Sequence, residues 1–258
     1  MTSEPQQTHE NPDTRPDADT GTGTGADTGP DAAVATVAAS ADVLRHPEAG
    51  EHLLTAVEKE RAARFRHEAA RVDFTAAHIL VRLCAARLLG VPAAGLTLAQ
   101  NCPDCGKGDH GKPYLPDHPD VSVSLSHTKG VVAAAAGHRP IGVDVELNAR
   151  SGSLLDVAGR VLTAAELRQV EAHADPASAF LRFWVRKESL IKIGRTSLDE
   201  LAGVDLSGLA LDLPAGGPLL SRFEELYLLD WVDDAHGAAV AAVSAVPPRV
   251  VVLAPPAG

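Results

Sequence analysis

Residues 141–146 read Ile-Gly-Val-Asp-Val-Glu, so apolar residues at positions 141, 143 and 145 alternate with glycine or acidic residues. This period-two pattern predicts a β-strand with one face in the core. Asp144 and Glu146 therefore leave the strand on the opposite face, side by side. Two neighbouring carboxylates repel each other unless a cation or a shared proton lies between them. The pair fits a magnesium site, in which carboxylates and substrate phosphates share the ion, and it also fits a solvated strand face.

A second informative stretch, residues 183–192, reads Phe-Trp-Val-Arg-Lys-Glu-Ser-Leu-Ile-Lys. It lies in a predicted helix over residues 177–193. Trp184, Glu188 and Lys192 are four residues apart, so they share one face of that helix. The helix could add a carboxylate and a cation to a metal site, but an ordinary Glu188–Lys192 ion pair is the simpler interpretation.

The flanking sequence predicts an α+β fold. An apolar stripe from Glu58 to Leu89 indicates one helix, and a capping box from Thr163 to Glu166 opens another. Alternating or short apolar runs predict strands at 121–126, 131–136 and 141–146, and a hairpin at 226–246. Helix and strands, followed again by helix and strands, favour two similar α+β halves that meet near residue 140.

These patterns divide the chain into four segments. Residues 1–34 are rich in Thr, Gly, Asp and Pro and contain seven acidic residues and one arginine. So little apolar surface cannot offset the entropy of ordering, and we expect a disordered acidic tail. We expect an N-terminal half over residues 35–140, a C-terminal half over residues 141–246 and a short tail over residues 247–258.

The charge balance disfavours nucleic acid as a ligand. The net charge is −11, and −5 remains when the acidic tail is set aside. A protein that binds a phosphate backbone needs an excess of Lys and Arg. No apolar run reaches the roughly 20 residues that span a bilayer, no signal-peptide pattern opens the chain, and three cysteines do not suggest a disulfide framework. We expect a cytoplasmic protein without a membrane partner.

Two shorter motifs suit phosphate binding. Gly111-Lys112-Pro113 precedes the first predicted strand, and Ser126-His127 closes that strand. A loop lysine supplies a point charge, a serine hydroxyl supplies a donor, and a protonated histidine supplies another. For each motif alone, the simpler explanation is favoured: Gly-Lys-Pro forms a turn, and His127 is a surface residue.

Taken in chain order, the motifs Gly-Lys-Pro, Ser-Leu-Ser-His, Ile-Gly-Val-Asp-Val-Glu and Phe-Trp-x-x-Lys-Glu-Ser-x-x-Lys resemble the Sfp-type 4′-phosphopantetheinyl transferase family. They span residues 111–192, and beyond them the resemblance is one of layout. It implies a pseudo-twofold pair of α+β halves with the cofactor between them. It also implies an activity: a magnesium-dependent transfer of 4′-phosphopantetheine from coenzyme A to a serine of an apo carrier protein, which releases adenosine 3′,5′-bisphosphate.

The resemblance also implies roles for individual residues. The expected metal ligands, for Mg²⁺ or alternatively Mn²⁺, are Asp144, Glu146 and Glu188. The expected contacts to coenzyme A are Lys112, Pro113, Ser126, His127 and Lys187. Lys192 would support the leaving phosphate, and Glu188 would accept the serine proton, directly or through water. Arg61 and Arg71 are the candidates for the 3′-phosphate, because Asp73 stands where many relatives carry an arginine.

The expected partner is an acyl or peptidyl carrier protein. The family branch suggests carriers of secondary metabolism, such as those of polyketide or nonribosomal-peptide synthesis, while fatty-acid carriers stay open. Because two halves of one chain would supply a whole site, we expect a monomer.

Three other interpretations stay open. Cys102-Pro103-Asp104-Cys105 and His110 suit a zinc site with a further ligand such as His118, although a zinc ribbon usually has two cysteine pairs. A non-catalytic carrier-binding module would not need the full set of acidic and basic residues. A different magnesium–nucleotide enzyme is disfavoured, because no Gly-x-x-x-x-Gly-Lys-Ser/Thr loop is present.

Overall fold

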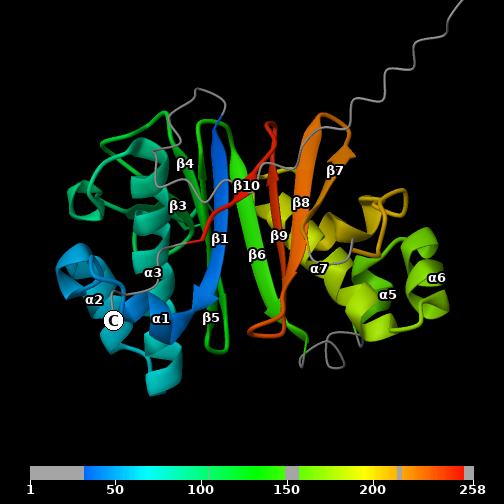
Figure 1. Cartoon of the computed structure of the whole chain (residues 1–258), viewed down its shortest axis with the longest axis horizontal. Coiled ribbons are helices and arrows are strands. Elements are labelled where there is room, and N and C mark those ends of the chain that lie inside the picture. The colour runs from blue at the N-terminus through cyan, green and yellow to red at the C-terminus, as the bar shows by residue number, and fades with distance from the viewer. Residues whose placement is uncertain (1–31, 104, 149–156, 214–216, 253–258) are drawn as a thin grey trace, which may run out of the picture.

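The structure is a computed structural model that describes residues 32–103, 105–148, 157–213 and 217–252. Two sheets lie in the middle of the molecule, with helices on the two outer sides (Figure 1). The first half contains β1 (Ala33–Ala39), α1 (Ser40–Leu44), α2 (Ala56–Ala63), α3 (Glu68–Leu89), β2 (Ala99–Asn101), β3 (Lys112–Tyr114), β4 (Ser122–Thr128) and β5 (Val131–Gly137). After it come β6 (Ile141–Leu147), α5 (Ala158–Val161), α6 (Ala164–Ala172), α7 (Pro176–Lys192), β7 (Leu219–Phe223), β8 (Leu226–Asp233), β9 (Ala238–Ser244) and β10 (Arg249–Val250).

The two large sheets share one plan. Their strand orders are β10-β1-β5-β4 and β6-β9-β8-β7. In the first sheet β1 pairs antiparallel with β5, and β5 pairs antiparallel with β4. In the second sheet β6, β9 and β8 pair in the same way. Each half is thus a strand, a long helix and a returning hairpin, which confirms the predicted α+β fold with a pseudo-twofold pair of halves.

The core has three layers of apolar side chains. One lies between α3 and the first sheet and includes Leu80 and Ala134. The next lies between the two sheets and includes Ala135 and Val143. The last lies under α7 and includes Phe183. Alternate alanines of β5 therefore face different layers, and their small side chains let the neighbouring elements approach closely.

The two sheets meet along their edge strands β4 and β6, where side chains replace part of a backbone ladder. The N–H of Ile141 donates to Ser122 Oγ at 3.3 Å, and the N–H of Val143 donates to Ser124 Oγ at 3.0 Å. A buried strand edge with unpaired N–H groups would be costly. The serines that alternate along β4 therefore satisfy the edge of β6 and join the two halves.

The predicted helix over residues 58–89 is wrong in one respect, because it is divided into α2 and α3. The ring of Phe65, between the two helices, lies 5.3 Å from the ring of Phe74 in α3. In a continuous helix, residues nine apart lie about 13 Å apart along the axis. The break therefore lets Phe65 fold back onto α3. None of the described helices is long and apolar enough to cross a membrane.

Both predicted tails are shorter than expected. The strand β1 begins at Ala33, inside the segment predicted as a tail, because Ala33 and Val34 are buried and pair with β5. In the C-terminal tail, β10 pairs in parallel with β1, so the chain returns to the first sheet. The rest of the predicted disordered tail, residues 1–31, and the last residues of the predicted C-terminal tail, 253–258, lie outside the described residues.

We expect Gly142→Ala to destabilise the protein strongly. Gly142 lies in β6 under α7, and a Cβ atom there would collide with the carbonyl oxygen of Ser189. Overpacking of this kind typically costs about 1–3 kcal/mol. Gly159→Ala is the matched control, because a Cβ atom at Gly159 in α5 meets no atom within 4 Å. Urea unfolding should show a loss of stability for the first variant and no loss for the second; equal stabilities would contradict the close packing of α7 on β6.

Candidate functional site

The candidate site lies where β4, β6 and the end of α7 meet. Asp144 in β6 is buried, and its Oδ1 accepts hydrogen bonds from Ser126 Oγ at 2.7 Å and from Lys192 Nζ at 2.9 Å. The three residues come from the three elements. The structure therefore brings together the Asp-x-Glu strand, the Ser-His strand end and the helix motif, which lie far apart in the sequence.

Lys192 connects the two halves of the molecule. It is the last residue of α7, and its Nζ also donates to the carbonyl oxygens of Val143 at 2.6 Å and Leu125 at 3.2 Å. These carbonyls belong to β6 and β4, the edge strands of the two sheets. The ammonium group is thus held at the junction, and it neutralises the buried carboxylate of Asp144.

Glu146 and Glu188 complete a group of three carboxylates. Glu146 leaves β6 on the same side as Asp144 and accepts a hydrogen bond from Thr128 Oγ1 at 3.0 Å. Glu188 is half-buried in α7, and its pKa is raised to about 7. Burial is the largest cause, the negative charges of Asp144 and Glu146 act in the same direction, and Lys192 opposes them. Glu188 therefore lies close enough to both strand carboxylates to sense their charge.

The chemistry of this group fits a hard divalent cation. All three residues offer carboxylate oxygens, the donors that Mg²⁺ prefers. The mutual repulsion that raises the pKa of Glu188 is the kind of interaction that a cation relieves. The residues predicted as metal ligands thus lie within electrostatic reach of one another, where β6 meets α7.

His127 follows Ser126 but lies on the side of β4 that faces α3. Its ring remains open to solvent on one side, yet the surrounding protein disfavours the charged form and lowers its pKa. The positive charges of Lys192 and Arg61 act in the same direction, and Asp73 opposes them. A neutral ring can still donate one hydrogen bond, and a phosphate beside it would favour the protonated form.

Lys112 and Pro113 lie in the short strand β3, next to the start of β4. This strand pairs with β2, so that Lys112 lies opposite Asn101, and the side chain of Lys112 is exposed. Gly111 has φ 97°, and a Cβ atom there would collide with the backbone of Asn101. The glycine of the Gly-Lys-Pro motif is therefore required by the tight packing of this loop, and the lysine is free to reach a ligand from the surface.

The two arginines predicted at the 3′-phosphate are separated in the structure. Arg61 donates to the carbonyl of Asp109 and lies with its guanidinium 5.3 Å from the centre of the Phe74 ring, beside the Gly-Lys-Pro loop. Arg71 is exposed, pairs with Glu68 and lines a different groove. Of the two alternatives, Arg61 is the one whose charge reaches His127, so it is the better candidate for the 3′-phosphate.

The structure corrects the prediction that Lys187 contacts coenzyme A. Its side chain is fully buried, and Nζ donates to Glu166 Oε2 at 2.7 Å. Three carbonyl oxygens, those of Val161, Leu201 and Val204, accept from the same Nζ at 2.8 Å each. Burial lowers the pKa of Lys187, and the hydrogen bond to Glu166 opposes this effect. Lys187 therefore points into the C-terminal core and away from the carboxylates.

The first half contains a counterpart of this buried ion pair. Glu166 is the third helical residue of a capping box in α6, and Glu58 has the same position in α2. Glu58 pairs with the buried Arg82 of α3, as Glu166 pairs with Lys187 of α7. Each half thus uses one cation on its long helix to hold the preceding short helix. This repetition indicates that Lys187 has a structural role, equivalent to that of Arg82 in the first half.

The structure gives Ser126 and Asp73 partners that the sequence did not reveal. The hydroxyl of Ser126 has one proton, which it donates to Asp144, so its predicted role as a phosphate donor is replaced by the orientation of that carboxylate. Asp73 is buried and accepts from Ser40 Oγ at 2.6 Å and from the N–H of Gly130 at 3.1 Å. It fixes the β4–β5 turn. Thr128 was missed, although it continues the alternation of hydroxyl residues along β4.

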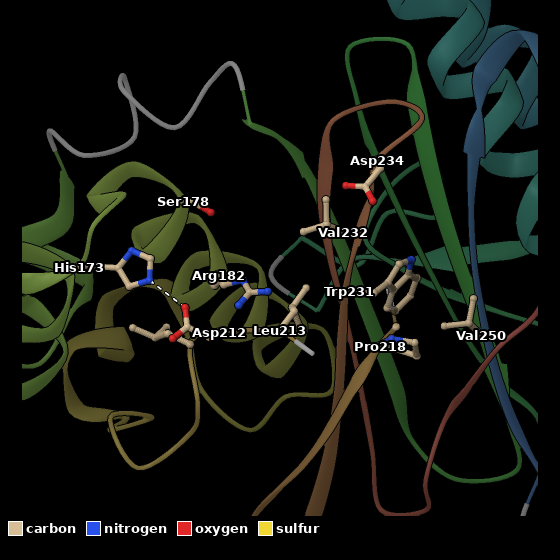
Figure 2. Close-up of a pocket in the computed structure, with 12 residues that line it drawn as sticks. His173, Ser178, Arg182, Asp212, Leu213, Pro218, Trp231, Val232, Asp234 and Val250 are labelled. Carbon is tan, nitrogen blue, oxygen red and sulfur yellow. Dashed lines mark hydrogen bonds and ion pairs between the residues drawn. The ribbon is translucent and has the colours of Figure 1, made fainter. Parts of the chain in front are cut away.

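A separate groove lies in the C-terminal half (Figure 2). His173 Nε2 and Asp212 Oδ1 lie 3.3 Å apart there, within hydrogen-bond distance. Arg182 and Trp231 also line this groove. None of the residues predicted to bind the metal or coenzyme A lines it, so it contributes nothing to the candidate site.

The sequence of this chain is similar to those of known proteins. A family model described as the 4′-phosphopantetheinyl transferase superfamily matches residues 140–244. A 4′-phosphopantetheinyl transferase of Bacillus subtilis is 30% identical over 141 residues, which cover 54% of this chain and 59% of the relative. The 4′-phosphopantetheinyl transferase Sfp of Bacillus subtilis (strain 168) is 26% identical over 136 residues, which cover 52% and 57%. The chain thus spans less than two thirds of the length of these relatives.

Substitution of each of the two lysines of α7 should show that Lys187 stabilises the fold and that Lys192 contributes much less to stability. Lys187→Met leaves the fully buried Glu166 without its cation, which typically costs about 3–5 kcal/mol. We expect its melting temperature to fall by on the order of 10 °C. The side chain of Lys192 is partly exposed, so we expect Lys192→Met to lower the melting temperature by much less. If the two melting temperatures changed equally, Lys187 would not have the structural role described above.

Glu188→Gln should stabilise the protein at alkaline pH when divalent ions are removed by a chelator. The folded pKa is about 7 and the ordinary value is 4.5, so the folded chain binds more protons between these values. The wild type therefore loses stability as the pH rises from about 4.5 to 7, whereas the glutamine cannot ionise. After allowance for solvent screening, we expect a difference on the order of 1–2 kcal/mol at pH 8 and little difference below pH 4.5.

Thermal unfolding of both proteins at several pH values measures this effect. Glu171→Gln, at an exposed position in α6, is the control and should follow the wild type at every pH. A pH-independent difference between the wild type and Glu188→Gln would mean that Glu188 is not held near the other carboxylates.

Proposed function

We propose that this chain belongs to the 4′-phosphopantetheinyl transferase superfamily, which its similarity to that family model and to two relatives supports, and that it transfers 4′-phosphopantetheine from coenzyme A to a serine of an apo carrier protein. One observation supports this most directly: Asp144, Glu146, Glu188 and Lys192 share one place at the junction of the two halves. Acyl and peptidyl carriers, including those of polyketide and nonribosomal-peptide synthesis, are the proposed partners. A monomer is proposed because both halves of the site come from one chain, and a cytoplasmic location stays a prediction.

We propose Asp144, Glu146 and Glu188 as the ligands of Mg²⁺, with Mn²⁺ as the alternative. The ion would neutralise the pyrophosphate oxygens of coenzyme A and act as a Lewis acid on them. Ser126 and Thr128 support this role of the chain, because their hydroxyl groups orient the carboxylates of Asp144 and Glu146. Such partners typically fix the orientation of metal ligands.

The cations around the site suit the two phosphate groups of coenzyme A. Lys192 is held beside Asp144, where it would support the charge on the phosphate that leaves. Arg61 and His127 lie on the α3 side, within electrostatic reach of each other, and Lys112 is exposed in the adjacent strand β3. We propose that these three residues, with Pro113 beside them, bind the 3′-phosphate end of coenzyme A.

The reaction is a phosphoryl transfer that depends mainly on positioning and charge neutralisation. The carrier serine Oγ forms a bond to the β-phosphorus of coenzyme A, and the bond from that phosphorus to the bridging oxygen breaks. Adenosine 3′,5′-bisphosphate leaves with the bridging oxygen. The serine proton passes to Glu188, directly or through water. A carboxyl group with a pKa of about 7 suits proton acceptance near neutral pH.

The test is the intact mass of an apo carrier protein incubated with this protein, coenzyme A and MgCl₂. We expect the carrier to gain one phosphopantetheine group, and a chelator to prevent the gain. Glu188→Gln should slow the transfer by roughly 100-fold or more, as expected for the loss of a proton acceptor. The exposed Glu171→Gln variant should retain wild-type rates.

The outcomes distinguish the proposal from its alternatives. A mass gain that persists in Glu188→Gln would reject the proposed proton acceptor. Binding of coenzyme A without transfer to any of several unrelated carriers would favour a non-catalytic carrier-binding module. No binding of coenzyme A at all would reject the transferase.

A further inference from the structure

The loop between β2 and β3 brings together two cysteines and a histidine. The ligand atoms of Cys102, Cys105 and His110 all lie within 4.8 Å of one another. Cys105 Sγ is 3.3 Å from His110 Nε2. Among the residues that the structure describes, His118 is not part of this cluster, so the fourth zinc ligand that the sequence left open is not found there.

The backbone of the loop holds the two cysteines together. The N–H of Cys102 donates to the carbonyl of Lys107 at 3.0 Å, and the N–H of Gly106 donates to the carbonyl of Cys102 at 2.9 Å. Gly106 has φ 68°, a conformation that glycine adopts without strain. This tight turn brings the chain back past Cys102, so that both sulfur atoms face His110.

Asp109 orients the imidazole ring. Its Oδ1 lies 2.7 Å from His110 Nδ1, while Arg64 Nη1 approaches its Oδ2 at 3.3 Å. An ionised carboxylate only accepts hydrogen bonds, so Nδ1 carries the proton, and the Nε2 lone pair is directed toward the sulfur atoms. Histidines that bind metals are commonly held in this way by a carboxylate on the other ring nitrogen.

Few apolar side chains hold this loop in place. Among its described residues, from Cys102 to Gly111, only Cys102 is buried. A segment with so little apolar contact gains little from burial to offset the entropy of ordering. The loop nevertheless determines where Lys112 begins β3, and the carbonyl of Asp109 accepts from Arg61. A ligand that joins the two cysteines to His110 would stabilise this arrangement.

We propose that Cys102 Sγ, Cys105 Sγ and His110 Nε2 bind a zinc ion that orders the loop between β2 and β3. Thiolate and imidazole ligands select zinc over magnesium or calcium, which prefer oxygen. Cys105 is exposed, so the fourth tetrahedral position faces solvent and is filled by water. The site does not share residues with the carboxylate group at Asp144, and it does not depend on the transferase activity proposed above.

The first test is the metal content of untagged, reduced protein after dialysis against zinc and then against metal-free buffer. We expect about one zinc per chain. Cobalt should replace zinc and give the visible and near-ultraviolet absorption of a thiolate-bound ion. Cys105→Ser and His110→Ala should lose the zinc and change this spectrum. Asp109→Asn should retain the three ligands but bind zinc roughly 10-fold more weakly, because the carboxylate orients the ring.

Two substitutions serve as matched controls. Cys84→Ala removes the cysteine buried in α3, and His118→Ala removes the histidine outside the cluster. Both should bind zinc and cobalt as the wild type does. The proposal is overturned if the reduced wild type stays metal-free under zinc excess, or if Cys105→Ser and His110→Ala bind as much zinc as the controls.

Hydrogen exchange tests the structural role separately. Zinc should slow amide exchange within residues 99–114 and leave the β8–β9 hairpin unchanged. Equal exchange of the zinc-bound and chelator-treated protein in that segment would show that the ion does not order the loop. Neither measurement uses coenzyme A or a carrier, so each result is independent of whether the protein proves to be a transferase.

Discussion

The hydrogen-bonded contact between the edge strands β4 and β6 is the interaction on which the rest of the structure depends. The first two hydroxyl groups along β4 accept hydrogen bonds from the N–H groups of Ile141 and Val143. The next two donate hydrogen bonds to the carboxylates of Asp144 and Glu146. One row of side chains thus both joins the two sheets and orients the acidic residues. Because the same contact makes the fold and the site, the site exists only where both halves are present.

The repeated plan of the two halves also explains how one chain can separate stability from chemistry. Each half holds its short helix through a buried ion pair, Glu58 with Arg82 and Glu166 with Lys187. The leading strands differ, since β1 has no acidic residue whereas β6 carries Asp144. Lys187 therefore belongs to the repeated framework, and Lys192, five residues further along α7, belongs to the site.

Sequence patterns predicted much of this structure because the relevant signals are local. The period of two in residues 141–146 is sufficient to predict that Asp144 and Glu146 share a face, and Ile141, Val143 and Val145 lie in the core as expected. The boundaries of the long helix were less accurate. Phe65 contacts Phe74 because the chain folds back between α2 and α3, and the helical periodicity of the sequence does not predict such a break.

By itself the sequence determined the α+β class, the two repeated halves and the residue types of the carboxylate group, because periodicity and motif order are properties of neighbouring residues. The tertiary structure decided which partners each long side chain contacts. Lys187 and Lys192 belong to one helix motif, yet one is buried against Glu166 and the other reaches Asp144, since the helix packs between two different environments. It also decided that Ser126 serves Asp144 and that Cys102 and Cys105 meet His110, because these distances depend on how separate segments pack.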